Sequence, residues 1–518
     1  MAQIIICAGI SVVPYIRPVG PFQLANVLRQ QGYTVQVIDQ YPWIAHLGAD
    51  RVIELFDKFV GPETLWIGYS STWFKRIETL MPGPDDHQPG GVMKDIDEIR
   101  LNTLLFNDAD LIKIKRSVLT KNPNVKFVLG GARSPIGKNT RPSFGSPLID
   151  YYIEGYADNT VVRFSQWCQD TTQSLNALEN FDGSYSIIDD PKATGFDYNN
   201  FSFRWHEHDL VNHGETLPME IARGCIFNCA FCSYPLNGRR KMDYLKNPSI
   251  LREQFIDNYN RFGTTSYFFL DDTFNDSVEK LQILHDEVFS KLPFKIKFGA
   301  FMRLDLINAH PETIPLLRDM GVSGAFLGIE SLNSESNKVI GKGINQEKII
   351  SILTTLKQEW PDVIIDAQFI MGLPYDSEET IRQWLDLLLT PEFPLDAAKI
   401  EPLHLDSSKI NHAIWISQFE LNPTKFGYTF SDTTRPMMWT NNMGFSLDDA
   451  VQLKKEYGKR WKVKEKAAWV GDYGSMNIGV PPDVVEARRK FPQNVIYGSD
   501  YSTRIAFVKK YIAKLLAL

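Results

Sequence analysis

Short apolar runs alternate with amphipathic stretches through the first third of the chain. The runs, each of strand length, lie at 4–8, 34–39, 64–70, 125–131 and 150–156. Between the first two runs, Leu24, Val27 and Leu28 share one helical face, and Gly32 suits the position just after a helix. Because buried strands that alternate with helices read as near-continuous apolar runs, this pattern predicts a doubly wound parallel sheet of the α/β class.

A second series of apolar runs begins at residue 217. Helical patterns separate its members, which lie at 217–223, 266–271, 297–302, 324–330, 364–371 and 397–405. A unit of about 30 residues for each strand and helix is typical of a (β/α) barrel. The six runs predict a partial (β/α)6 barrel, and a barrel carries its chemistry at the carboxyl ends of its strands.

The length and composition of the chain define its expected organisation. A chain of 518 residues is too long for one core. Residues after 405 carry helical patterns and many aromatic side chains, which predict a mostly helical cap or substrate domain. We therefore expect a doubly wound domain, a linker, the barrel and the cap, with boundaries at 1–165, 166–214, 215–405 and 406–518.

Charge and hydropathy exclude several classes of protein. The hydrophobic content of 43% is too high for a disordered chain, and the net charge of −7 argues against a general nucleic-acid binder. Residues 1–9 are apolar but too short for a signal peptide or a membrane span. We therefore expect neither a membrane nor bulk nucleic acid as a partner.

Cys225, Cys229 and Cys232 follow the first barrel run at C-x3-C-x2-C spacing, and the chain has only five cysteines. Three thiolates on one loop can hold three irons of a [4Fe–4S] cluster and leave the fourth iron open for substrate chemistry. Zinc is one alternative, but a structural zinc site would need a fourth Cys or His, and Cys7 and Cys168 are distant. Buried apolar thiols are the other alternative. Disulfides are disfavoured because no secretory segment is evident, and we expect a reducing cytoplasm.

The cysteine spacing, with Phe231 directly before the last cysteine, resembles the signature of the radical S-adenosylmethionine (SAM) enzymes. The resemblance implies that the three cysteines hold a [4Fe–4S] cluster and that SAM binds its open iron. It also implies that Phe231 and residues at other strand ends contact these cofactors.

The later strand ends resemble the cofactor contacts of that family. Glu330 and Ser331 close the fourth run, where the resemblance implies a contact with the SAM ribose; a surface glutamate opening the next helix is the alternative. Asp272 ends the second run, as a cofactor contact or as a residue of a turn or a helix N-cap. Arg303 follows the third run and would pair with the SAM carboxylate or a substrate anion, or form a salt bridge at the rim. Gly372 begins a Gly-Leu-Pro turn that would pack against adenine.

The N-terminal third resembles a cobalamin-binding domain, in which a serine follows the third strand and a glycine pair follows the fourth. The serine would be Ser70 or Ser71. The glycines would be Gly130 and Gly131, which let the backbone approach a nucleotide tail. A flavodoxin-like sheet with turn glycines is the alternative. His87 fits the D-x-H-x-x-G pattern of an axial ligand, but it comes after the third strand rather than the first, so we expect a solvated loop there.

The resemblances together imply a function. They imply reductive cleavage of SAM to a 5′-deoxyadenosyl radical and cobalamin-dependent methylation of an unactivated carbon. Alternatives are a radical rearrangement, cyclisation or oxidation with or without cobalamin, and a corrinoid or Fe–S sensor without turnover. The expected partners are a small-molecule or peptide substrate and an external one-electron reductant of the flavodoxin or ferredoxin type. The segment after residue 405 has no cysteine, which argues against an auxiliary cluster.

Overall fold

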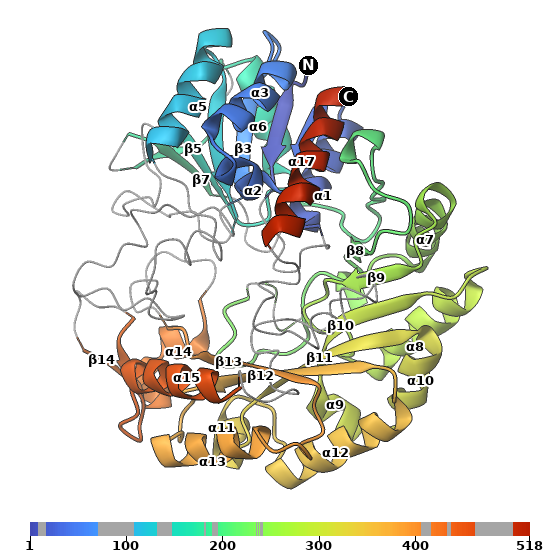
Figure 1. Cartoon of the computed structure of the whole chain (residues 1–518), viewed down its shortest axis with the longest axis vertical. Helices are drawn as coiled ribbons and strands as arrows, with labels where there is room; N and C mark the ends of the chain where they lie inside the picture. The colour runs from blue at the N-terminus through green and yellow to red at the C-terminus, as the bar shows by residue number, and fades with distance from the viewer. Residues whose placement is uncertain are drawn as a thin grey trace.

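Two large sheets of mainly parallel strands, one in the N-terminal third and one in the centre of the chain, organise the molecule (Figure 1). The computed structural model describes residues 1–8, 17–70, 108–131, 148–172, 174–180, 183–188, 195–234, 236, 238, 242–405, 416–431, 437–461 and 501–518.

The N-terminal sheet has seven strands in the order β2-β1-β3-β4-β5-β7-β6. All pairs are parallel except β6 with β7. In chain order the strands are β1 (Ile4–Cys7), β2 (Val35–Ile38), β3 (Trp66–Ser70), β4 (Lys126–Gly130), β5 (Tyr151–Glu154), β6 (Leu178–Glu179) and β7 (Tyr185–Ile188). The first five coincide with the predicted runs. The last two strands extend the sheet beyond residue 165. They were not predicted, because their sequences are too short or too polar to be recognised as strands.

Helices cover both faces of this sheet. They are α1 (Val19–Gln30), α2 (Tyr41–His46), α3 (Ala49–Phe59), α5 (Asp108–Lys121) and α6 (Thr160–Gln169). Alternate residues of β1 enter separate cores: Ile4 and Ile6 pack with residues of α1 and α6, whereas Ile5 and Cys7 pack with residues of α3 and α5. The predicted doubly wound α/β architecture is thereby confirmed.

The central sheet has six parallel strands in the order β13-β12-β11-β10-β9-β8. In chain order they are β8 (Leu217–Met219), β9 (Ser266–Phe269), β10 (Lys297–Arg303), β11 (Val322–Glu330), β12 (Ile364–Met371) and β13 (Ala397–Pro402). Each strand coincides with a predicted run. The linear strand order leaves β8 and β13 as edges, which is the predicted partial barrel.

Helices accompany the strands of the barrel, and all but α7 lie along the side of the sheet that faces away from the N-terminal sheet (Figure 1). They are α7 (Pro248–Phe262), α8 (Val278–Glu287), α9 (Leu304–Ala309), α10 (Thr313–Met320), α11 (Ser334–Val339), α12 (Gln346–Glu359) and α13 (Glu378–Leu388). Short 3₁₀ turns are η1 (Glu207–Asp209), η2 (Met242–Tyr244) and η3 (Phe289–Lys291).

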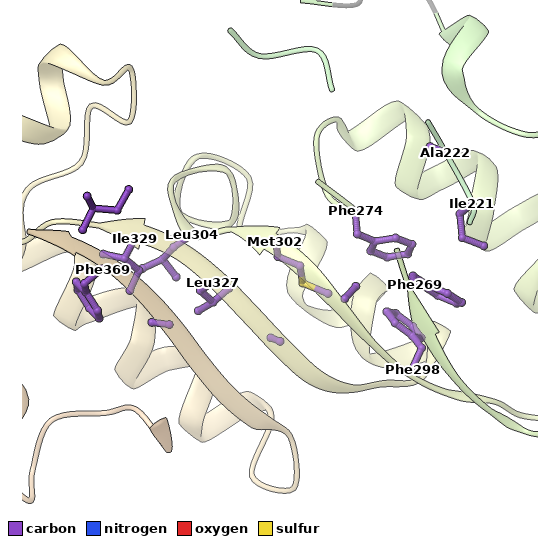
Figure 2. Packing of buried hydrophobic residues seen from close by; sticks show 14 of the residues in the cluster. Ile221, Ala222, Phe269, Phe274, Phe298, Met302, Leu304, Leu327, Ile329 and Phe369 are labelled. Atoms are coloured by element: carbon purple, nitrogen blue, oxygen red, sulfur yellow. The ribbon is translucent and has the colours of Figure 1, made fainter. Parts of the chain in front are cut away.

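Aromatic packing anchors the loop that follows β9. The ring centroids of Phe269 and Phe298 lie 4.6 Å apart, and Phe274 lies 5.3 Å and 5.1 Å from them (Figure 2). All three side chains are buried, and Ile221 of the segment after β8 lies beside them. Since Phe274 belongs to the loop itself, this packing fixes the polar residues that precede it.

The C-terminal segment divides between the two sheets. Its elements are α14 (Gln418–Leu421), η5 (Pro423–Phe426), β14 (Thr429–Phe430), β15 (Trp439–Thr440), α15 (Leu447–Trp461) and α17 (Tyr501–Ala517). α15 contacts β13 of the barrel. α17 instead packs on α2 and α3, where Tyr511 and Leu515 join the same core as Ile5 (Figure 1). None of the described helices combines the length and apolarity that a membrane span requires.

Candidate functional site

The cysteine loop leaves the carboxyl end of β8 and enters the mouth of the barrel. Cys225 is buried, and Cys229 and Cys232 are half-buried. All five cysteines are free in this structure. Backbone bonds fold the loop on itself: the Cys232 N–H donates to the Cys229 carbonyl at 3.0 Å, and the Cys225 N–H donates to the Leu236 carbonyl at 3.1 Å. Three thiols are thus collected on one short loop.

The loop after β9 supports the cysteine loop from below. Asp271 accepts from the Ile221 and Ala222 N–H groups at 3.0 Å and 2.9 Å, and the buried Lys280 ammonium lies 3.0 Å from its other oxygen. Thr273 Oγ1 lies 3.4 Å from Cys225 Sγ. Thr273 and Lys280 were not predicted from the sequence. The available signal was that a polar run follows β9 and the cysteine loop follows the adjacent strand, β8.

Asp272 is held against the cysteine loop rather than at a helix end. Its Oδ2 accepts from the Gly224 N–H at 3.1 Å, and Gly224 has the positive φ of 119° that favours glycine. Burial and, to a lesser extent, the neighbouring Asp271 raise the pKa of Asp272 and the Gly224 N–H opposes the shift, which leaves the pKa at about 7. The alternative N-cap role is wrong, because Ser277 caps α8.

Arg303, at the end of β10, is buried against the same loop. Its Nη1 donates to Cys229 Sγ at 3.2 Å, and its guanidinium stands 3.9 Å from the centroid of the Phe227 ring. Its Nε and Nη2 pair with Asp305 at 3.0 Å and 2.6 Å, and Nη2 also donates to the Gly341 carbonyl. The structure therefore places this cation on a cysteine sulfur.

Glu330 ends β11 in a strained conformation. It is buried and has a φ of +72°, in the region that favours glycine. A Cβ on Gly328 would lie 2.7 Å from Glu330 Oε1, so a side chain there would force the carboxylate to shift. Burial raises the pKa of Glu330, whereas Lys342, 3.5 Å away, lowers it. A surface glutamate opening a helix is excluded by this burial.

Ser331 completes the turn after Glu330. Its hydroxyl accepts from the Asn333 N–H at 3.0 Å, and its carbonyl accepts from Asn337 Nδ2 at 2.6 Å. Asn333 in turn caps α11. Sequence reasoning missed Lys342, which lies between two glycines in the loop after α11. This Gly-Lys-Gly sequence was the available signal, since glycines allow a loop to approach a neighbouring strand end closely.

Gly372 lies where β12 meets the C-terminal segment. Its φ is +100°, and a Cβ there would lie 2.0 Å from Cη2 of the buried Trp439. Its carbonyl accepts from the Tyr428 hydroxyl at 2.9 Å, and its N–H donates to the buried Asp376 at 3.1 Å. The rings of Trp439 and Tyr428 thus pack against Gly372, in the turn that was expected to contact adenine.

A cavity of about 380 Å³ opens at the carboxyl ends of the N-terminal strands. Ser70, Gly130 and Gly131 line it, and Ser70 pairs with Gly130 in the β3–β4 register. Its walls are mostly apolar side chains and glycines. Ser71 and His87 lie outside the described residues.

Arg223 joins this cavity to the cysteine loop. It lines the cavity together with Glu220 and Asp158, and it precedes Gly224 and Cys225 in the chain. Its guanidinium donates to Glu220 at 2.8 Å and 3.0 Å and to Asp158 at 2.9 Å. Sequence reasoning missed this residue, although its position directly before the cysteine motif was a signal.

A second contact crosses the same junction. The hydroxyl of Tyr156, in the loop after β5, lies 2.5 Å from the hydroxyl of Tyr234, two residues after the last cysteine of the loop. Tyr156 also packs under the Arg223 guanidinium, 5.1 Å from ring centroid to carbon. The cavity and the cysteine loop therefore share one wall.

Comparison with known proteins finds similarities in the barrel and in the overall fold. Residues 219–388 match the model of the radical SAM superfamily. The fold is similar to that of the radical SAM methyltransferase TsrM from Kitasatospora setae, solved with tryptophan and a SAM analogue, with a TM-score of 0.58 and 13% identity over 99% of this chain and 100% of that one. Another TsrM structure, with cobalamin and a [4Fe–4S] cluster, gives a TM-score of 0.54 over 78% of this chain and 75% of that one, at 15% identity.

Curated relatives have a higher sequence identity but match only in part. The anaerobic magnesium-protoporphyrin IX monomethyl ester cyclase of Cereibacter sphaeroides is 22% identical over 50% of this chain and 44% of its own length. The bacteriochlorophyllide d C-12(1)-methyltransferase of Chlorobaculum tepidum is 25% identical over 38% of this chain and 42% of its own length. This chain therefore spans less than half of either relative. Residues 219–388, which carry Cys225, Cys229 and Cys232 at the barrel mouth, therefore match the radical SAM superfamily.

Proposed function

We propose that this protein is a cobalamin-dependent radical SAM methyltransferase that acts on an unactivated carbon. When bound, the cluster and SAM supply a carbon-centred radical, and cobalamin supplies a transferable methyl group. The observation that carries the proposal is the shared wall: Arg223 belongs both to the cavity of the N-terminal sheet and to the start of the cysteine loop. A cofactor in that cavity would lie next to the barrel mouth.

The thiols fit a cluster with one open iron. Cys225, Cys229 and Cys232 supply three ligands, and Cys7 and Cys168 lie on other elements of the N-terminal domain. Thr273 and Arg303 contact two of the sulfurs and orient them. We propose that the fourth iron is left to SAM.

Glu330 fits a SAM contact at the strand ends. Its carboxylate is buried beside Lys342, and its backbone is strained, which is typical of residues held for a binding role. We propose that it accepts hydrogen bonds from the ribose hydroxyls. Asp272 positions the cysteine loop through Gly224 and, in this proposal, touches no cofactor directly.

The N-terminal cavity fits an extended organic tail. Glycines at the strand ends let a ligand approach the backbone, as Gly130 and Gly131 do here, and Ser70 offers a hydroxyl at the same edge. We propose that these residues contact cobalamin and that the substrate, a small molecule or a peptide, binds between the cavity and Cys225. An external one-electron reductant would deliver the electrons.

A second outcome of the same chemistry is a cyclisation or rearrangement, and the partial match to the cyclase favours it as the rival. Anaerobic purification with cobalamin supplied, followed by metal analysis and mass spectrometry of released cofactors, tests the cofactors. We expect about four irons and one corrinoid per chain. Incubation of reduced protein with SAM and candidate substrates should give 5′-deoxyadenosine and a methylated product; a cyclised product without added methyl would replace the proposal by its rival.

A further inference from the structure

We infer that Arg303 is a positioning residue for the cluster: it holds the sulfur of Cys229 and raises the reduction potential of the bound cluster, and it does not bind the SAM carboxylate. The inference deepens the proposed function and rests on a [4Fe–4S] cluster being held by the three cysteines. It replaces the role that the sequence suggested for this arginine with one that the contacts support.

The first argument is the contact with sulfur. Arg303 Nη1 lies 3.2 Å from Cys229 Sγ, and the guanidinium stacks on Phe227, two residues before that cysteine. The arginine therefore grips the loop at two points. Its own backbone is fixed as well, because the Arg303 N–H donates to Asn275 at 2.8 Å and its carbonyl accepts from the same side chain at 3.0 Å.

The second argument is the number of donors already engaged. A guanidinium has five N–H groups in a planar fork. Contacts with Asp305, Cys229 and Gly341 use four donor interactions, from Nε, Nη1 and Nη2. A two-pronged clamp on the SAM carboxylate would need two parallel donors, which are now directed at Asp305. Binding SAM in that way would require this buried pair to break.

The third argument is electrostatic. Reduction adds one negative charge to the cluster, and a buried cation that donates a hydrogen bond to a ligand sulfur stabilises that charge. Arg303 is 4% exposed, so solvent screens the interaction weakly. Asp305 opposes the effect, since its carboxylate lies 2.6 Å from Nη2. Removing the cation and removing the carboxylate should therefore shift the potential in opposite directions.

The test is a potentiometric titration of the reconstituted cluster, followed by EPR, in the wild type and in R303M, R303K and D305N. We expect R303M to make reduction at least tenfold less favourable, which for a one-electron couple is 59 mV. R303K, which keeps the charge but not the planar fork, should fall between R303M and the wild type. D305N should shift the potential upward, a change of sign that a general loosening of the site would not produce.

Arg29→Gln is the matched control. Arg29, whose side chain is 13% exposed, also pairs with a carboxylate, that of Asp209 at 2.8 Å, but it belongs to α1 of the N-terminal domain. R29Q should leave the cluster potential unchanged. If R303M does not retain iron, R303K and D305N provide the measurement.

SAM affinity, measured by equilibrium dialysis, completes the test. The inference holds if R303M keeps the SAM affinity of the wild type and changes the potential. It is overturned if R303M with a full complement of iron keeps the wild-type potential, and a tenfold loss of SAM affinity in that case would assign Arg303 to the SAM carboxylate. A wild-type protein that binds no iron would instead refute the proposed function.

Discussion

Arg223 and Asp158 form an ion pair between the barrel and the N-terminal domain, with 2.9 Å from Nη1 to Oδ2. Arg223 lies directly before the cysteine loop, and Asp158 follows β5 at the edge of the cavity. The two side chains are 7% and 4% exposed, so the pair is screened little by solvent. The pair therefore links the edge of the cavity to the residue that precedes the cysteine loop.

Replacing Arg223 by Met should destabilise the protein strongly. Two carboxylates, Asp158 and Glu220, would be left near each other without their cation, and removing one partner from a buried pair costs about 3–5 kcal/mol. Thermal unfolding and limited proteolysis at the domain junction would measure the loss. R382M is the control, since Arg382 pairs with Glu456 at the surface and such pairs contribute about 0–1 kcal/mol. Equal losses in R223M and R382M would contradict the assignment.

Replacing Cys225, Cys229 and Cys232 together by Ala should abolish iron binding and 5′-deoxyadenosine formation while leaving the fold intact. The thiols are the ligands of the proposed cluster, whereas the loop is also held by backbone hydrogen bonds. Iron analysis, product assay and circular dichroism check the three expectations. C168A should keep its iron. Undiminished 5′-deoxyadenosine from the triple variant would reject the proposed chemistry.

Gly372→Ala should cost more stability than Gly444→Ala. Both glycines have positive φ, 100° and 75°, so alanine is strained at each by about 1–2 kcal/mol. Only at Gly372 does the added Cβ also meet the Trp439 ring, at 2.0 Å, and overpacking typically adds about 1–3 kcal/mol. Chemical unfolding of the two variants gives the difference. If G372A is no less stable than G444A, Trp439 does not pack as described.

Asp376→Asn should flatten the pH dependence of stability. Burial raises the pKa of Asp376 from 3.8 to about 7. Between these values the folded protein binds the proton and the unfolded chain does not, so this group's contribution to stability falls as pH rises from about 4 to about 7. Asparagine cannot titrate, yet its oxygen can still accept from Gly372 and its amide can donate to Ser336. Unfolding midpoints across this range measure the slope.

The exposed Asp50 provides the control for this slope. Its side chain is 83% exposed, and D50N should keep the wild-type pH dependence. A slope in D376N that matches the wild type would show that Asp376 does not carry the proton.

The sequence predicted the strand ends better than the partners of the side chains at those ends. Asp272 and Glu330 could be placed because each terminates an apolar run, and parallel strands bring their carboxyl ends to one edge. The partner of Arg303 could not be predicted from the sequence. A sulfur, a carboxylate and a cofactor can all accept from a guanidinium, and the sequence does not give the interatomic distances that decide among them. The contact between Trp439 and Gly372 could not be predicted either, because the two residues are far apart in the chain and neither local sequence indicates its partner.

The position of α17 concerns the order in which the chain can fold. Val508, Tyr511, Ile512 and Leu515 complete a core whose other buried members come from the first 152 residues, and the Asp39 N–H donates to the Tyr511 hydroxyl at 3.0 Å. During synthesis, the apolar side chains of α2 and α3 that pack on α17 therefore lack this partner until the whole barrel has been synthesised. The N-terminal domain is synthesised first, but its core is completed only when α17 has been made. Until then its apolar surface is available for aggregation and for chaperone binding.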